Sequence, residues 1–281
     1  MSRIVYVNGD FLPEKDAKIS VFDRGFLFAD GVYEVSSILE GRLIDNEAHL
    51  ARLERSLSEL EMALPIPVKE FVEAQEKLVA DNNVKEGALY LQVTRGVADR
   101  DFAYPKDVTP SLVMFTQAKN LITNEYSEKG IAIISIEDIR WARRDIKTVQ
   151  LLAPAMAKQA ALNAGANDAW LVEDGFVTEG SSNNAYIVKD GVLITRQLSN
   201  SILHGITRAA VLQLCKEDDV KLEERPFTMS EAYDADEAFI TSATTFVWLV
   251  VKMDGNDIAT GKPGPITKRL RQLYIDTALK K

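Results

Sequence analysis

A single lysine stands in a setting that could support chemistry. Lys147 lies in Arg140–Leu152, RWARRDIKTVQLL, where three arginines precede it and the stretch turns apolar after it. Taking an ammonium out of water is costly unless a partner compensates, and a lysine held neutral is a nucleophile for carbonyl compounds. Lys147 is therefore either an ordinary solvated lysine before a helix or the reactive amine of a site. The arginines are interpreted as loop and interface charges without a catalytic part.

A carboxylate and two hydroxyl-rich segments follow further along the chain. Glu179 ends a predicted hairpin strand in VTEGSSNNAYIV, where it is either a surface charge or the carboxylate of a site. Gly205, Ile206 and Thr207 open a predicted helix, whose free amides can hold a phosphate, although threonine is also a common N-cap. The TSATT segment, Thr241–Thr245, offers more hydroxyls and amides after a strand. A lysine, a carboxylate and two such phosphate cradles are together typical of a pyridoxal phosphate enzyme.

Turn signals and hydrophobic periodicity predict the elements that carry these residues. Asn8-Gly9, Glu40-Gly41 and Asp174-Gly175 lie between extended apolar segments and predict hairpins, as does NAYIVKDGVLIT. Helices are expected over residues 46–64, 68–81, 154–164 and 207–218 and from 266, and strands over 88–94, 111–117, 131–139, 237–241 and 246–253. Because strands outnumber helices and hairpins dominate, the expected fold class is α+β with two lobes.

Composition excludes several classes of protein. The net charge of −9 and pI near 5.0 argue against nucleic acid or anionic membranes as partners. There is no apolar run of about 18 residues and no apolar core of a signal peptide, so a cytoplasmic protein that acts on small molecules is expected. His49 and His204 are too far apart for a zinc cluster, so no metal is expected. Cys215, the single cysteine, lies in an apolar helical pattern and is expected to be a buried, reduced thiol.

The order of the motifs resembles a known family. DRGFLFADGVYE, HLARLERS, DIKTVQLL, VTEGSSNN, ILHGITR and FITSATT resemble segments of the fold-type IV pyridoxal phosphate aminotransferases. The resemblance is greatest to the D-amino acid (D-alanine) aminotransferases and runs from about Val5 to Met253. It implies a small α/β N-terminal domain and a larger C-terminal domain with a β-barrel-like core. The stretch AKNLITNEYSEKG is polar and unpatterned and is the candidate linker, so the expected bounds are 1–118 for the first domain, 119–124 for the linker and 125–281 for the second domain.

The resemblance implies a role for each matching residue. Lys147 forms a Schiff base with the cofactor, and its freed amine shuttles the proton at the substrate Cα. Glu179 pairs with the pyridine nitrogen, and Arg52 binds the phosphate with its planar fork. His49 lies three residues before Arg52 on the same helix face and supports the phosphate region; the alternative is a half-buried helix histidine with no role.

The remaining cofactor contacts are also implied by the resemblance. Further phosphate contacts fall to Ile206, Thr207, Ser242, Ala243 and Thr244. Leu203 is expected to pack on the ring face opposite the lysine. Two positions depart from the family: Ala243 stands where a threonine is common, and Phe246 stands where a glutamate often occurs.

Substrate recognition is expected to involve Tyr33, Arg100 and Phe102. The resemblance places Tyr33 near the active site and gives Arg100 the substrate carboxylate, whereas Arg95 is expected to be structural. The D-amino acid enzymes usually carry a histidine two residues beyond this arginine, and here Phe102 stands there. This change removes one polar partner from the carboxylate trap and leaves a looser or more apolar specificity open.

The implied activity is a ping-pong transamination between a D-amino acid, such as D-alanine or D-glutamate, and a 2-oxo acid. The resemblance implies a homodimer with sites at its interface. Three alternatives use the same fold: a branched-chain L-amino acid aminotransferase, which the Arg100 loop disfavours; an aminodeoxychorismate lyase; and an (R)-amine transaminase, which Phe102 favours. A cofactor-binding homologue without turnover is disfavoured because both Lys147 and Glu179 are present.

Overall fold

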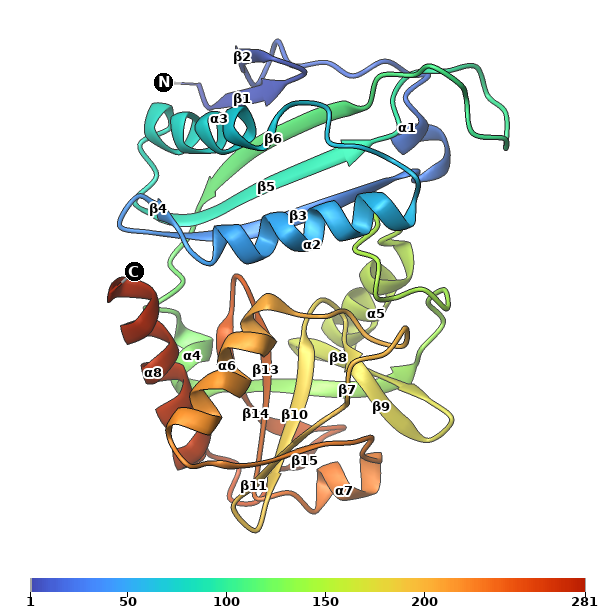
Figure 1. Ribbon diagram of the computed structural model, residues 1–281. Coiled ribbons are helices and arrows are strands. Elements are labelled where there is room, and N and C mark those ends of the chain that lie inside the picture. The colour runs from blue at the N-terminus through green and yellow to red at the C-terminus, as the bar shows by residue number, and fades with distance from the viewer. Residues whose placement is uncertain (1, 281) are drawn as a thin grey trace. The chain divides into compact units, whose positions relative to one another are not determined.

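The computed structural model describes residues 2–280 and divides the chain into two compact units (Figure 1). The first consists of the chain up to Asn120 together with Ile146–Gln150, and the second of Leu121–Asp145 and the chain from Leu151 onward. The expected linker, residues 119–124, spans the boundary at Asn120. Ile146–Gln150 departs from the expected continuous second domain, because its backbone pairs with a strand of the first unit: Tyr33 N donates to Lys147 O at 3.0 Å, and Val149 N to Gly31 O at 3.1 Å.

The first unit is built on an antiparallel six-stranded sheet with the order β2-β1-β6-β5-β3-β4. Its strands are β1 (Ile4–Val7), β2 (Asp10–Pro13), β3 (Gly31–Leu39), β4 (Arg42–Leu43), β5 (Glu86–Thr94) and β6 (Ser111–Ala118). The predicted hairpins at Asn8-Gly9 and Glu40-Gly41 are confirmed, and all four turn residues have a positive φ, as two-residue turns of this kind require.

Three helices accompany this sheet: α1 (Arg24–Phe28), α2 (Asn46–Glu59) and α3 (Val68–Asp81). Contacts join α2 to β3 and α3 to β1 and β6. The buried face of α2 includes Leu53 and Leu57, but the helix ends at Glu59 and not at Leu64 as predicted. Glu61 adopts a left-handed φ of 54°, which stops the helix although leucine spacing continues beyond it.

The second unit holds a nine-stranded mixed sheet with the path β12-β11-β10-β13-β14-β7-β8-β9, and β15 pairs with β14. Its strands are β7 (Ile131–Glu137), β8 (Asp168–Glu173), β9 (Phe176–Gly180), β10 (Asn184–Lys189), β11 (Val192–Thr195), β12 (Lys221–Glu224), β13 (Glu237–Ser242), β14 (Phe246–Met253) and β15 (Asn256–Asp257). The pairs β14–β7, β7–β8 and β11–β12 are parallel. The sheet curls into a half-barrel around a core that includes Trp170 and Phe227, in agreement with the predicted barrel-like core (Figure 1).

Five helices belong to the second unit: α4 (Glu125–Lys129), α5 (Leu152–Asn163), α6 (Ile206–Glu217), α7 (Met229–Tyr233) and α8 (Pro265–Lys280). The three longer ones were predicted, whereas α4 and α7 are single turns too short to show a period. Cys215 lies on α6 as a buried, free thiol, as predicted, and burial raises its pKa to about 11. Across residues 2–280, no helix has the length and apolar character needed to cross a membrane.

Candidate functional site

Lys147 is held on a backbone segment paired with β3, in the first unit. Its ammonium nitrogen lies 4.2 Å from the centroid of the Tyr33 ring, and its backbone N–H lies 3.4 Å from the Ser56 hydroxyl oxygen. Thr148 and Val32 form an antiparallel bridge beside it. The side chain is half-buried. The structure therefore brings together two predicted site residues, Lys147 and Tyr33, that are 114 positions apart in the chain.

Arg52 and His49 share a partner that the sequence did not reveal. Arg52 Nε and Nη2 donate to the two carboxylate oxygens of Glu34, each at 2.8 Å, and His49 Nδ1 lies 2.8 Å from Glu34 Oε2. All three side chains are buried. Burial alone would raise the pKa of Glu34, but Arg52 and His49 hold this pKa well below its ordinary value. Glu34 on β3 thus fixes the orientation of Arg52 and His49 on α2, the two residues predicted to serve the phosphate region.

Glu179 is a buried acid and not a surface charge. Its carboxylate accepts hydrogen bonds from Arg140 Nη1, from Asn184 Nδ2 at 3.0 Å, and from the backbone N–H of Leu203 at 3.1 Å. Burial raises the pKa of Glu179, and the Arg140 guanidinium opposes this rise. Within the second unit, two predicted cofactor-binding residues, Glu179 and Leu203, are thus in direct contact.

The interpretation of the arginines as loop and interface charges is wrong for Arg140. Its guanidinium lies between Glu179 and Asp138, donating to Asp138 through Nε at 2.9 Å and Nη2 at 2.7 Å. Both carboxylates are almost fully buried. Burial alone would lower the pKa of Arg140, but the negative charges of Glu179 and Asp138 raise it above its ordinary value. Arg140 therefore stays positively charged. Arg144 is also buried and binds Glu173, while Arg143 pairs with Asp145.

The start of α6 offers backbone amides without a side-chain cap. Gly205 is the N-cap residue, and no side-chain hydrogen bond caps the helix there. A Cβ at Gly205 would lie 2.0 Å from Asn184 Oδ1, so the backbone approaches that side chain too closely for any larger residue. Asn184 Nδ2 also donates to Leu203 O at 3.0 Å. This network ties the start of α6, with Ile206 and the buried Thr207, to the Glu179 carboxylate.

The second hydroxyl-rich segment forms the β13–β14 turn. Ser242 Oγ lies 2.8 Å from Thr245 Oγ1 and accepts the Thr245 N–H at 3.2 Å, and Ala243 and Thr244 lie between them. Phe246, where the family often has a glutamate, is fully buried and packs with its ring centroid 5.2 Å from that of Tyr274. This departure is therefore a core substitution. Figure 1 shows the β13–β14 turn and the start of α6 at the same end of the second unit.

Arg100 and Phe102 lie on the connection between β5 and β6. The Arg100 guanidinium carbon is 5.3 Å from the Phe28 ring centroid and 5.5 Å from that of Phe102. Among the residues described, no recorded contact joins Arg100 to Tyr33 or Lys147. Arg95 is structural, as expected: it is buried, and its Nε donates to Asp30 at 2.7 Å.

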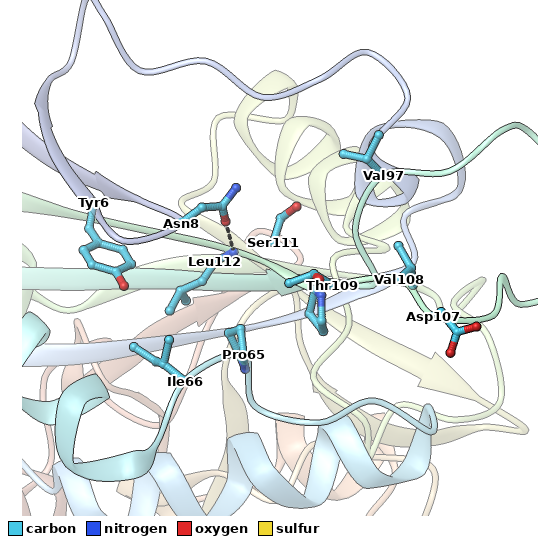
Figure 2. A pocket seen from close by; sticks show the side chains of 11 residues that line it. Tyr6, Asn8, Pro65, Ile66, Val97, Asp107, Val108, Thr109, Ser111 and Leu112 are labelled. Carbon is cyan, nitrogen blue, oxygen red and sulfur yellow. Dashed lines mark hydrogen bonds between the residues drawn. The ribbon is translucent and has the colours of Figure 1, made fainter.

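A separate hollow on the first unit has a volume of about 420 Å³ (Figure 2). It is lined by Tyr6, Asn8, Pro65, Ile66, Val97, Asp107, Val108, Thr109, Pro110, Ser111 and Leu112. None of these is a predicted site residue. The hollow therefore does not correspond to the predicted chemistry, although Val97 and Asp107–Pro110 belong to the same connection as Arg100.

Comparisons with known proteins support the family resemblance that the sequence motifs indicate. The family model for amino-transferase class IV matches residues 31–253. A D-alanine aminotransferase of Bacillus licheniformis is 41% identical over 275 residues, 98% of this chain and 97% of that protein. One of Staphylococcus aureus (strain N315) is 38% identical over 269 residues, 95% of each chain. A branched-chain aminotransferase of Thermoproteus uzoniensis, solved with norvaline, is 26% identical, with a TM-score of 0.88 over 100% of this chain and 96% of that one.

Proposed function

We propose that this chain, which belongs to the amino-transferase class IV family, transfers the amino group of a D-amino acid, such as D-alanine, to a 2-oxo acid. Relatives named D-alanine aminotransferase, at 38% and 41% identity over nearly the full length, support this substrate class. The structural observation that carries the proposal is the Lys147 amine, which lies against the Tyr33 ring on a segment paired with β3.

The cofactor is pyridoxal 5'-phosphate, which when bound supplies an electron sink for the carbanion formed at the substrate Cα. The residues present fit this group. The amine of Lys147 is half-buried, and Glu179 is a buried acid with ordered donors. The twelve-residue helix α6 begins without a side-chain cap, as suits an anion at its amides.

Lys147 is the residue that we propose to attach the cofactor covalently and, once displaced by substrate, to take and return the proton at the substrate Cα. Its backbone pairing with β3 limits the positions that the amine can reach. The face of the Tyr33 ring lies against the Lys147 nitrogen, 4.2 Å from its centroid, and forms no bond to it that would occupy the lone pair of the neutral amine. The neutral amine can therefore take up the proton, and the ammonium that results can return it.

Glu179 is proposed to pair with the pyridine nitrogen. Its oxygens accept from Arg140 and Asn184 and from the backbone N–H of Leu203, which lies 3.2 Å from Oε1 and 3.1 Å from Oε2. These donors fix the orientation of the carboxylate that is proposed to face the ring nitrogen. Leu203 is proposed to contact the ring, since its backbone N–H already contacts Glu179.

Phosphate binding is proposed to use Arg52 and the start of α6. Glu34 binds the Nε–Nη2 edge of Arg52 and fixes the plane of the guanidinium, which is proposed to contact the phosphate from this fixed orientation. Glu34 and His49 then act by orienting Arg52. The backbone amides of Ile206 and Thr207 supply further donors, together with groups of Ser242, Ala243 and Thr244.

Arg100 is proposed to bind the substrate carboxylate. The homodimer implied by the family resemblance and the cytoplasmic location expected from the composition are part of the same proposal. A branched-chain L-amino acid aminotransferase is the second candidate. It is supported by the likeness to a solved branched-chain enzyme at 26% identity, which is weaker than the likeness to the D-alanine enzymes.

The test is to incubate the purified holoenzyme in turn with D-alanine, L-leucine and (R)-1-phenylethylamine and to follow the visible absorbance of the bound cofactor. We expect D-alanine to bleach the band and the other two compounds to leave it. Bleaching by L-leucine alone would instead establish the branched-chain candidate and reject the D-amino acid.

A further inference from the structure

The Arg100 guanidinium is flanked by aromatic rings and not by acids. Its carbon lies 5.3 Å from the Phe28 centroid and 5.5 Å from the Phe102 centroid, and the two rings meet edge to face at 5.5 Å. Arg100 is exposed, and Phe102 is 78% exposed. Within residues 2–280, no ion pair between Arg100 and a carboxylate is recorded.

Hydrogen bonds from Arg24 on α1 hold the segment around Phe102 in place. Arg24, on the same helix as Phe28, stacks over that ring at 4.5 Å. Its Nη1 donates to the carbonyl oxygens of Asp101 at 2.6 Å and Ala103 at 3.4 Å, one on either side of Phe102. The backbone that carries the second ring is thus hydrogen-bonded at both neighbours.

One acid, Asp30, whose side chain is 9% exposed, holds the two arginines that fix this arrangement. Asp30 Oδ2 accepts from Arg24 Nε and from Arg95 Nε, each at 2.7 Å. Arg95 in turn stacks on the Tyr104 ring at 3.5 Å. The loop is therefore attached to a buried ion cluster through Asp101, Ala103 and Tyr104, even though Phe102 itself projects into solvent.

The chemistry of such a flank suits an anion receptor. An aromatic face attracts a guanidinium without accepting any of its N–H groups in the ring plane, so all five donors stay available. A neighbouring carboxylate would neutralise the cation and consume its bidentate edge. Two rings hold the cation in place and leave that edge for a planar carboxylate.

We propose that Phe28 and Phe102 form an aromatic clamp that positions Arg100 to bind the substrate carboxylate, with Phe102 replacing the polar partner that the D-amino acid enzymes usually have there. The inference rests on the proposed function, because it needs a substrate with a carboxylate. Phe28 and Phe102 are specificity-determining positioning residues, and they touch Arg100 and not the reacting atoms.

The kinetic test compares Phe28→Leu with Phe28→Tyr, which keeps the aromatic face. Phe26→Leu is the matched control, since Phe26 is also on α1, is 76% exposed, and has no recorded ring contact among the described residues. With D-alanine as substrate, we expect Phe28→Leu to raise KM about 3- to 10-fold, the range of one cation–π contact, with kcat within twofold. The inhibition constant for propionate, a carboxylate without an amine, should rise in parallel. Phe28→Tyr and Phe26→Leu should match the unsubstituted enzyme.

A second measurement does not depend on catalysis: the rate of tryptic cleavage after Arg100, followed by mass spectrometry. A clamped arginine is cleaved only when the loop opens locally, so Phe28→Leu should speed this cleavage about 3- to 10-fold, and Phe28→Tyr and Phe26→Leu should not. Unchanged cleavage in Phe28→Leu overturns the clamp. Faster cleavage with unchanged KM and propionate inhibition overturns its role in carboxylate binding. If the unsubstituted enzyme does not react with D-alanine, the proposed function fails, and the cleavage rates still decide whether the clamp exists.

Discussion

Replacement of Arg140 by methionine is the perturbation that most sharply tests the buried charge network. Methionine keeps much of the length of the side chain and removes the cation. Arg140 Nη1 binds Glu179, and its Nε and Nη2 bind Asp138. The side chain of Asp138 is 0% exposed and that of Glu179 is 4% exposed. Neither acid can therefore regain solvation unless the structure opens locally.

Among residues 2–280, Arg140 is the one cation recorded as paired with Glu179, so the main cost is expected from the loss of this pair. Arg144 remains within 3.4 Å of Asp138 Oδ2, so that carboxylate keeps a charged partner. Glu179 keeps only the neutral donors of Asn184 and Leu203. Breaking one buried ion pair costs about 3–5 kcal/mol, so we expect a single cost of this size and not two. Neutralising the stranded acid in Arg140→Met/Glu179→Gln should recover about 1–3 kcal/mol.

The measurement is urea denaturation of the apoprotein at pH 7, which removes stabilisation by bound cofactor. Arg225→Met is the control, since Arg225 is 40% exposed and pairs with exposed acids at the surface of the same unit; it should lose less than about 1 kcal/mol. A loss below that level in Arg140→Met, or a double variant no more stable than the single one, would refute the view that Arg140 compensates Glu179.

Two further predictions concern other parts of the site. Glu34→Gln should lower the free energy of unfolding by about 3–5 kcal/mol at pH 7, since it removes the charge that pairs with Arg52 in the buried cluster. Because the pKa of Glu34 is lowered in the folded protein, its stabilisation is complete above the ordinary value of 4.5 and is lost as the pH falls through the lowered pKa, so the difference between the two proteins in urea denaturation should shrink steadily below pH 4.5. A constant difference would contradict this. Gly205→Ala should weaken cofactor binding about tenfold, because the alanine Cβ would displace Asn184 at a cost of about 1–3 kcal/mol. An unchanged dissociation constant in fluorescence titration of the apoprotein would show that the close contact between Gly205 and Asn184 does not matter for cofactor binding.

Local signals predicted most of the fold. Asn8-Gly9 sets its hairpin because both residues take a positive φ, and α3 has the predicted bounds, Val68–Asp81. Where prediction failed, longer-range or finer geometry decided. The leucine period continues past Glu61, but the backbone turns there. Ile146–Gln150 joins the first unit through pairing with β3, which no local pattern encodes.

The chemistry-bearing residues were easier to find than their partners. Lys147 and Glu179 stood in recognisable motifs, whereas Arg140 looked like one of three loop arginines. Its contact with Glu179 spans 39 positions, and its contact with Asp138 only two. The nearby acid was the available signal, since an Asp two residues before an Arg can bind it, but nothing local indicates that both are buried. Glu34 was missed for the same reason, because β3 and α2 bring it to Arg52.

The identity of the lysine that carries the cofactor decides whether Lys147 is the reactive amine of this protein. Borohydride treatment of the holoenzyme fixes the cofactor permanently to the amine that holds it, and digestion with mass spectrometry locates the added phosphopyridoxyl group. We predict that the group is found on Lys147, in the peptide that contains DIKTVQLL, and that Lys147→Ala, although folded, carries none. A group on another lysine, or no group on Lys147, would contradict the account.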